Sequence, residues 1–442
     1  MELWGDETAK AIANFPVSGE PLPSVVIHWL GRIKEAAAIV NGDLGLCDAD
    51  RARRIAAAAG AVAAGLHDDQ FPVDIFQTGS GTSSNMNANE VIAHLAGSDV
   101  HPNDHVNLGQ SSNDVFPTAV HLAALELTID NLLPALRNLE GTLRTKAAEF
   151  ADVITMARTH LMDAVPITLG QEFGAFAAQI KLGCERIEAT IPRVASVPLG
   201  GTAVGNGLNT HPEFAARVRA RLADEYGRPI AAPTDAFEAQ ASRDALVELS
   251  GSLKVLAVSL TKIANDIAWM ASGPRGGLGE IVLPELQKGS SIMPGKVNPV
   301  LAEVVLQVAA QVIGNDTAIT LGGSQGNFQL NVRVPLIARN LLSSLQLLTN
   351  ATRLFADNCV AGIVAKVDRT AWLAEHTLAA ATALNPVLGY DRVAKIVQRA
   401  EREGTSLRRA ALDEGVEESV VESALNAARL AGVRTDRSDE QR

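Results

Sequence analysis

Two serine-rich clusters in the first quarter of the sequence contain residue types that bind a small anion. They read TGSGTSSN and GQSSND, and their candidate positions are Ser80, Gly81, Thr82, Ser111, Ser112 and Asn113. Glycine lets the backbone approach a ligand closely, and hydroxyl groups beside a helix N-terminus donate hydrogen bonds to an anion. Each cluster alone fits an ordinary helix cap equally well.

A third cluster, ARTHLMDAV, places Arg158, Thr159 and His160 ahead of a predicted helix. Histidine is the side chain best suited to exchange protons near neutral pH. Arg158 could anchor a carboxylate or form an ion pair with a local acid. A lone histidine also fits a hydrogen-bonded structural role, so this cluster indicates chemistry only together with the others.

The fourth cluster, KGSSIMPGKVNPVLAE, has an apolar Ile-Met-Pro core between Gly289 and Gly295. Hydroxyl groups precede this core, and a lysine and an amide follow it. A glycine-flanked loop with a polar tip can open and close over a ligand. Lysine supplies a point charge for a carboxylate, and asparagine adds directed donors. The candidate residues here are Ser290, Ser291, Lys296, Val297, Asn298 and Glu303.

Long helices must position these clusters, because apolar residues recur at alternating spacings of three and four. The pattern predicts five long helices that pack as a bundle. Pro117 is expected in the first turn of the first helix, and Pro134 is expected to kink or divide it. The apolar stripes run through Leu122–Leu143, Leu169–Ile187, Leu246–Met270, Leu301–Val312 and Leu341–Cys359.

The predicted fold class is mainly all-α, with the long-helix bundle between two smaller domains of mixed or helical structure. The expected boundaries are residues 1–109 for an N-terminal domain with substrate-binding loops, 110–366 for the bundle, and 367–442 for a small helical domain. Helices of this length often bury their remaining apolar surface against other subunits, which predicts an oligomer.

Bulk composition narrows the function classes. The formal net charge of −12 argues against nucleic acid and anionic membrane surfaces as partners. Cys47, Cys184 and Cys359 are far apart and form no metal-binding pattern, and no nucleotide-binding glycine motif follows a strand-like run. We therefore expect no cofactor and no metal. The odd cysteine count, and the lack of a recognisable signal peptide or a membrane-length apolar run, predict a cytoplasmic protein.

The string GSSIMPGKVNP closely resembles the signature of the fumarase/aspartase superfamily, and the other three clusters match that superfamily in order and spacing. The resemblance runs from LWG near the start to LNPVLGYDRVAKI near the end. Three details resemble the class II fumarase branch: His160, where aspartases typically have glutamine, MPGK in place of MPAK, and FQTGSGTSSNMN.

This resemblance implies hydration of fumarate to L-malate without a cofactor. It implies that Ser290 removes the proton from C3 of malate, and that His160, paired with Glu303, acts on the hydroxyl side through a bound water. It also implies a homotetramer with a twenty-helix core, in which three subunits share each active site. The implied substrate contacts are Thr82, Ser112, Asn113, Thr159, Lys296 and Asn298, with Ser80, Gly81, Ser111, Ser291 and Val297 close by.

The motif HPND resembles a second, non-catalytic dicarboxylate site of the superfamily through His101, Pro102, Asn103 and Asp104. An arginine is common three residues before this histidine, but Ser98 stands there, so His101 fits a surface turn equally well. Three other functions stay open at this stage: an aspartate ammonia lyase, a hydratase for methylated fumarate, and a catalytically silent helical scaffold.

Overall fold

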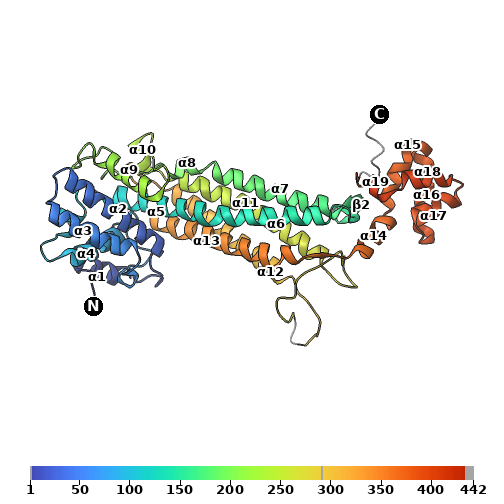
Figure 1. Cartoon of the computed structure of the whole chain (residues 1–442), viewed down its shortest axis with the longest axis horizontal. Coiled ribbons are helices and arrows are strands. Elements are labelled where there is room, and N and C mark those ends of the chain that lie inside the picture. Colours follow the sequence, from blue (N-terminus) through green and yellow to red (C-terminus); the bar gives the residue numbers. More distant parts are fainter. Residues whose placement is uncertain (1, 290–291, 434–442) are drawn as a thin grey trace. The chain divides into compact units, whose positions relative to one another are not determined.

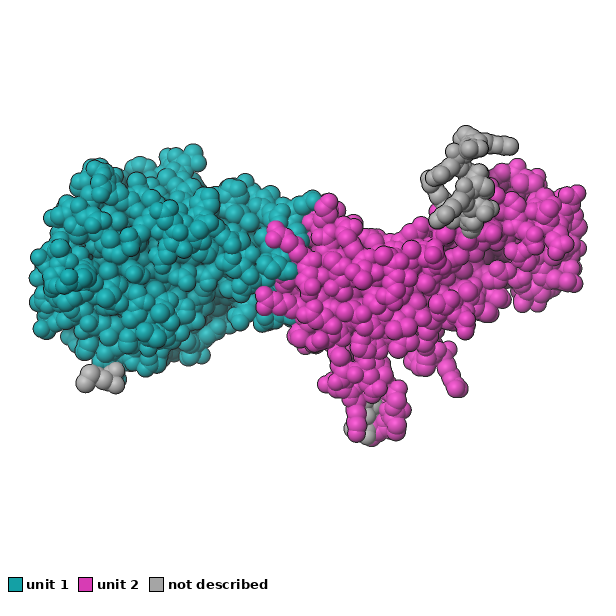
Figure 2. Space-filling view, in the orientation of Figure 1, with its two compact units in different colours: residues 1–134, 183–258, 308–350 teal, residues 135–182, 259–307, 351–442 magenta. Residues whose placement is uncertain are grey.

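The computed structural model describes residues 2–289 and 292–433. Its internal contacts divide the chain into two compact units, coloured separately in Figure 2. Unit 1 comprises residues 1–134, 183–258 and 308–350, and unit 2 comprises residues 135–182, 259–307 and 351–442. The three-domain division at residues 109/110 and 366/367 stays a prediction.

The long helices are the dominant elements, and the apolar stripes predicted them correctly (Figure 1). Most positions of the stripes are buried, including Leu246, Leu253 and Leu260, which are almost fully buried. Narrow apolar stripes of this kind make helices pack side by side. The long helices are α5 Ser112–Glu126, α6 Leu133–Glu149, α7 Leu169–Glu188, α11 Asp244–Met270, α12 Val300–Gly323 and α13 Val334–Asn358.

The two proline expectations have different outcomes. Pro134 lies at the start of α6, which follows a π-helical segment, η3 Leu127–Leu132. The helix continues through this segment from Ser112 to Glu149, so it is not divided at Pro134, and the alternative of a kink there stays a prediction. The expectation for Pro117 was wrong, because α5 begins five residues earlier and Pro117 lies inside it. A capping box starts α5: the Ser111 side chain accepts a backbone N–H, and the Asp114 side chain accepts the N–H of Ser111.

The other elements of unit 1 are the 20-residue helix α2, with Trp29, Leu30 and Ile33 buried, and several shorter helices. Helix α2 packs against α3, α5 and α9. These elements are α1 Asp6–Asn14, α2 Ser24–Asp43, α3 Ala49–Ala63, η1 Asp68–Gln70, α4 Thr82–Ala96, η2 Pro102–Val106, α8 Ile191–Val194, α9 Phe214–Tyr226 and α10 Ala236–Ala241.

Unit 2 contains two small antiparallel sheets that the sequence reading missed. One is the hairpin of β1 Ile154–Thr159 and β2 Met162–Thr168, and the other pairs β3 Ile281–Val282 with β4 Val364–Ala365. A cluster of short helices with its own apolar core, including Leu384, Ile396 and Val421, completes the unit. These helices are η4 Val360–Gly362, α14 Val367–His376, η5 Leu378–Leu384, α15 Asn385–Leu388, α16 Tyr390–Glu403, α17 Leu407–Asp413, α18 Glu418–Ala424 and α19 Ala427–Leu430.

Two helical stretches in the described residues, Ser112–Glu149 and Val300–Gly323, are long and apolar enough to cross a membrane by length and composition alone. Core helices of folded proteins pass the same test, and the first stretch is mostly buried. The sequence expectation that no apolar run approaches membrane length was therefore too strict, while the expectation of no membrane partner stays a prediction.

Candidate active site

Three side chains from the two serine-rich clusters meet in unit 1. The Ser80 and Thr82 hydroxyl oxygens are 2.7 Å apart, and those of Thr82 and Ser112 are 2.8 Å apart. We call Ser80, Thr82 and Ser112 the hydroxyl cluster. The sequence placed these residues 30 positions apart, and the fold brings them into one hydrogen-bonded chain. Each hydroxyl can turn to donate to an anion, because its hydrogen rotates freely.

Two helix N-termini converge at the hydroxyl cluster, since Thr82 is the first residue of α4 and Ser112 is the first residue of α5. The helix dipoles favour a negative group at this point. Gly81 has a left-handed conformation with φ of 78°, and a Cβ there would lie 2.2 Å from the Phe116 ring. Glycine is thus required for this turn, and both helices can approach each other only because of it.

Asp114 holds the second serine-rich cluster in place. Its carboxylate accepts the N–H groups of Ser111 at 2.9 Å, and of Gly200 and Thr202 at 3.0 Å each. The neighbouring Asn113 side chain donates to the carbonyl of Ala203 at 3.0 Å. Residues 200–203 are therefore part of this site, although the sequence gave no sign of it beyond a glycine pair.

Two fully buried ionisable side chains, Asp114 and Lys34, contact the second serine-rich cluster. Burial raises the pKa of the Asp114 carboxyl to about 6 and lowers the pKa of the Lys34 ammonium to about 7. Their mutual attraction opposes the shift at Lys34. The Lys34 Nζ atom is 3.3 Å from Oε1 of Gln110, which precedes the serine pair. With this lowered pKa, Lys34 is only partly charged at neutral pH. Sequence analysis missed it because it lies within an apolar helix.

In unit 2, Thr159 and His160 lie at the tip of the β1–β2 hairpin. His160 and Leu161 form the two-residue turn, with φ of 57° and 60°, and both side chains are exposed. Tight hairpin turns of this length use positive φ at both central positions. The turn therefore presents His160 to solvent in this single chain.

Arg158 forms an ion pair with Glu280, with its Nη1 atom 2.8 Å from Oε2, so the alternative of a local acid partner is the one observed. Glu280 is 1% exposed and also accepts a very short hydrogen bond from the Thr155 hydroxyl. Glu280 thereby fixes the base of the hairpin that carries His160. Sequence reasoning missed this residue, since a single acid in a glycine-rich turn has no distinctive spacing.

A cavity of about 760 Å³ lies beside the hairpin within unit 2. Arg158 and His160 line it, together with Glu172 and Lys262. Burial raises the pKa of Glu172, and the nearby Lys262 ammonium partly opposes this shift. The cavity thus combines a titratable histidine with charged groups of both signs.

The fourth cluster forms a loop between β3 and α12. The Asn298 amide donates to the Gly289 carbonyl at 2.7 Å, and a Cβ on Gly289 would lie 1.8 Å from the Lys296 carbonyl oxygen. This bond closes the loop on itself and requires glycine at its base. Lys296 and Val297 are exposed, whereas Ser290 and Ser291 lie outside the described residues.

Glu303 is exposed in the first turn of α12. No hydrogen bond joins its side chain to His160 within the described part of a single chain, so the expected pairing of these two residues stays a prediction. His101, Asn103 and Asp104 lie in one exposed turn, where the His101 Nδ1 atom accepts the N–H of Asp104 at 3.1 Å. In residues 2–289 and 292–433, no group of three or more His, Cys, Asp or Glu side chains could hold a metal ion.

The helical fold and this arrangement of polar clusters define a lyase: residues 2–314 match the family model described as "Lyase", and residues 381–432 match the one described as "Fumarase C C-terminus". The chain is 54% identical to the class II fumarate hydratase of Mycobacterium tuberculosis, covering 94% of this chain and 88% of that protein. It is also 54% identical to the corresponding protein of Corynebacterium efficiens, covering 93% and 88%. The chain belongs to the class II fumarate hydratase family.

Solved structures agree with this assignment. The class II fumarase of Schistosoma mansoni superposes with a TM-score of 0.95 at 38% identity, covering 97% of this chain and 96% of that one. A fumarate lyase:delta crystallin from Brucella melitensis superposes with a TM-score of 0.94 at 44% identity, with the same coverage. The resemblance to the superfamily and to its fumarase branch is confirmed.

Proposed function

We propose that this protein is a fumarate hydratase that adds water reversibly to fumarate and forms L-malate. The observation that carries the proposal is the 54% identity to class II fumarate hydratases across nearly the whole chain. The hydroxyl cluster at two helix N-termini supports it, because that arrangement suits a carboxylate.

The hydroxyl cluster, with Asn113 beside it, binds one carboxylate of the substrate in this proposal. Its hydroxyl groups already share hydrogen bonds at 2.7 and 2.8 Å, so little reorganisation is needed when a carboxylate replaces one partner. The Asp114 contacts to residues 111, 200 and 202 keep these donors in place.

Proton transfer is assigned to the other clusters. Ser290 removes the C3 proton of malate, and the resulting charge spreads onto the adjacent carboxylate, where Lys296 and Asn298 stabilise it as it develops. His160, oriented by Glu303, assists departure of the C2 hydroxyl as water on the opposite face. Elimination is therefore anti, and hydration of fumarate follows the same path in reverse. Thr159, Ser291 and Val297 lie next to these groups in the sequence and complete the proposed substrate contacts.

A homotetramer with a twenty-helix core is the proposed assembly, with three subunits contributing to each active site. Exposure of both His160 and Glu303, without a hydrogen bond between them in one described chain, supports completion of the site by other subunits. Exposed apolar side chains on the long helices, such as Val258, Ile313 and Leu321, supply surface for that contact. We also propose a cytoplasmic location and no nucleic-acid or membrane partner.

The test follows the ultraviolet absorbance of the fumarate double bond with purified protein and no added metal. L-Malate should generate the absorbance and fumarate alone should lose it. Thr82→Val removes the central hydroxyl of the cluster and should raise KM for fumarate about 10- to 100-fold, equivalent to about 1–3 kcal/mol for a lost bond to a charged group. Thr142→Val, which removes an exposed hydroxyl from α6, serves as the control.

Two outcomes would contradict the proposal. Loss of fumarate only in the presence of ammonium would indicate an ammonia lyase. Equal KM values for Thr82→Val and Thr142→Val would show that the hydroxyl cluster does not bind the substrate.

A further inference from the structure

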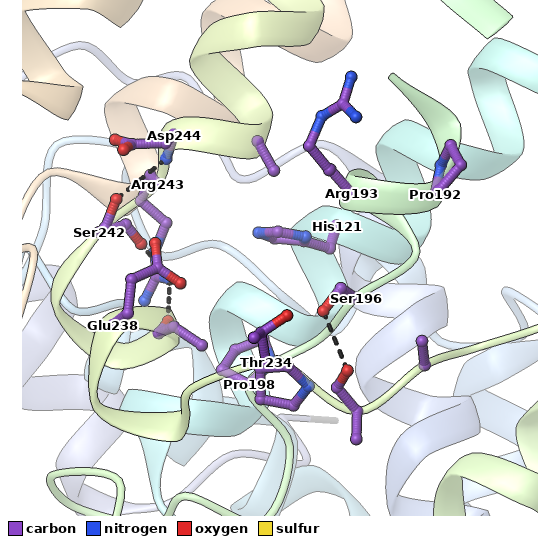
Figure 3. A pocket seen from close by; sticks show the side chains of 15 residues that line it. His121, Pro192, Arg193, Ser196, Pro198, Thr234, Glu238, Ser242, Arg243 and Asp244 are labelled. Carbon is purple, nitrogen blue, oxygen red and sulfur yellow. Dashed lines mark hydrogen bonds between the residues drawn. The ribbon is translucent and has the colours of Figure 1, made fainter. Parts of the chain in front are cut away.

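A cavity of about 390 Å³ lies in unit 1, lined by residues from α5, α8, α10, the start of α11 and the segments between them (Figure 3). None of the residues assigned to fumarate hydration lines it. His121 from α5 and Arg243 from the residue before α11 both contribute to its wall, and we call it the His121 pocket. Its exposed edge includes Ala232, Glu238 and Asp244.

His121 presents a hydrogen-bond acceptor at this pocket. The ring is 4% exposed, and its Nδ1 atom is 2.9 Å from the carbonyl oxygen of Val194, so Nδ1 carries the hydrogen and donates it. Burial, and to a lesser extent the positive charge of Arg243, lower the pKa of His121 to about 4. The ring is therefore neutral at pH 7, and Nε2 has a free lone pair. Within the described residues, Nε2 has no hydrogen-bond partner.

Arg243 presents a positive charge and an unused donor. Its side chain is 2% exposed, and its two terminal nitrogens donate to the backbone carbonyls of Ala239, Gln240 and Ser242. Burial lowers its pKa to about 10, so it remains a cation at pH 7. No carboxylate in the described part of the chain lies within ion-pair distance of it, and its Nε–H has no acceptor there. The N-terminus of the 27-residue helix α11 adds positive potential at the same point.

Unused polar atoms occur on two residues that line this pocket, His121 and Arg243, and on two neighbouring residues that do not line it. Besides His121 Nε2 and Arg243 Nε, the buried oxygens Gln240 Oε1 and Thr202 Oγ1 have no partner among the described residues. Gln240 connects Arg243 to Thr202. Its backbone carbonyl accepts a hydrogen bond from Arg243, and its side-chain amide donates one to the Thr202 carbonyl. A buried polar atom without a partner costs about 1–3 kcal/mol, and native proteins rarely leave several together. Such a group of atoms therefore points to a ligand.

We propose that the His121 pocket binds a small monocarboxylate whose adjacent carbon carries a hydroxyl or an amino group. The carboxylate accepts the Nε–H of Arg243 beside the α11 N-terminus, and the hydroxyl or ammonium group donates to Nε2 of His121. Both requirements follow from the chemistry of the two side chains, one a donor with positive charge and the other an acceptor.

The charges at the pocket edge limit the ligand to one carboxylate. Glu238 and Asp244 line the pocket at its exposed edge, and Arg193 there is already paired with Glu248. A dicarboxylate such as the proposed substrate would therefore meet repulsion at its second end. The two unpartnered nitrogens expose almost no surface, so the side chains that cover them must move aside for the ligand's polar groups to reach them. Only a small molecule can do this. The site is therefore distinct from the substrate site, and the proposal does not depend on the catalytic assignment.

The test uses saturation-transfer NMR on the full-length protein with L-lactate and L-alanine as probes. Acetate, which has the carboxylate but no adjacent donor, is the ligand control. Ala232→Phe places a large side chain at the pocket from an exposed position, where it does not endanger folding. Ala216→Phe makes the same change at an exposed site on α9 outside the pocket. His121→Phe keeps a ring and removes the acceptor.

We expect the wild type and Ala216→Phe to bind L-lactate or L-alanine with equal affinity. Ala232→Phe and His121→Phe should bind at least tenfold more weakly, and acetate should bind the wild type at least tenfold more weakly. Stronger binding of L-lactate would identify a hydroxy acid as the ligand class, and stronger binding of L-alanine an amino acid. No transfer to either probe would mean that only water occupies the pocket. Unchanged affinity in Ala232→Phe, or acetate binding as tightly as L-lactate, would equally overturn the proposal.

Discussion

The hydroxyl cluster in unit 1 and the hairpin tip in unit 2 are built in opposite ways. Ser80, Thr82 and Ser112 are linked by hydrogen bonds, and the buried Asp114 carboxylate fixes the neighbouring backbone. His160 is exposed in a two-residue turn. The hairpin that carries it is held in place by the ion pair of Arg158 with Glu280. Under the proposed function, the difference means that substrate binding is prepared within one chain, whereas the proposed proton-transfer groups depend on what is placed against them.

The largest effect should come from His160→Asn, which removes the proposed proton-transfer group and keeps a polar side chain. General acid–base groups contribute about 10²- to 10⁴-fold, so kcat for fumarate hydration should fall by that factor, with a small change in KM. Because the side chain is exposed, the melting temperature should not change. Steady-state kinetics and thermal melting measure both quantities.

The control for this change is His94→Asn, which alters an exposed histidine of α4 outside the proposed site. It should leave kcat unchanged. If the melting temperature of His160→Asn fell together with kcat, His160 would have a structural role. The contrast between the two regions would then be lost.

Glu280→Gln should have the next largest effect. It should lower both the free energy of unfolding and kcat. The change leaves Arg158 without its carboxylate partner at a site where Glu280 is 1% exposed. Breaking a buried ion pair from one side costs about 3–5 kcal/mol in the free energy of unfolding. The base of the hairpin loosens, so kcat should fall as His160 is less well placed. Chemical denaturation and kinetics on the same samples give both values.

Glu285→Gln is the matched control, since Glu285 is an exposed acid five residues further along the same segment. It should change neither stability nor rate. If Glu280→Gln lowered stability but left kcat intact in the remaining folded protein, Glu280 would not position His160.

Asp114→Asn tests the buried carboxylate of unit 1 through its pH dependence. Burial raises the folded-state pKa of Asp114 from 3.8 to about 6, so between these values the folded protein holds a proton that the unfolded chain releases. The free energy of unfolding of the wild type should therefore fall as pH rises from about 4 to 6, by roughly 3 kcal/mol relative to a variant without this group. Denaturation of both proteins across this range measures the difference.

At pH 4 the wild type should be the more stable protein, because asparagine cannot accept all three backbone N–H groups that the carboxyl group accepts. The stability gap should narrow toward pH 6. A gap that stays constant or widens with rising pH would show that Asp114 titrates at or below its ordinary pKa in the folded protein.

The sequence predicted the parts of this molecule that depend on local pattern. The stripe from Leu246 to Met270 corresponds to α11, because apolar spacing acts within one helix. The hairpin was missed, since ITMART and DAVPIT are short and precede a helix that dominates the pattern. Contacts such as Arg158–Glu280 join residues 122 positions apart and have no local signal. His121 and Arg243 were missed for the same reason, because their significance depends on atoms left without partners after folding.

The smallest effect is expected for His101→Ala, in an exposed turn of unit 1 outside the hydroxyl cluster. The His101 ring accepts the Asp104 N–H at the start of η2, so its loss should cost about 1 kcal/mol in the free energy of unfolding, as for other helix caps. The rate of fumarate hydration should stay within twofold of the wild type, because no contact links this ring to the hydroxyl cluster among the described residues. A change in KM beyond this range would give the HPND turn a role in binding substrate. It would also show that exposed residues of unit 1, and not only its hydrogen-bonded cluster, take part in binding.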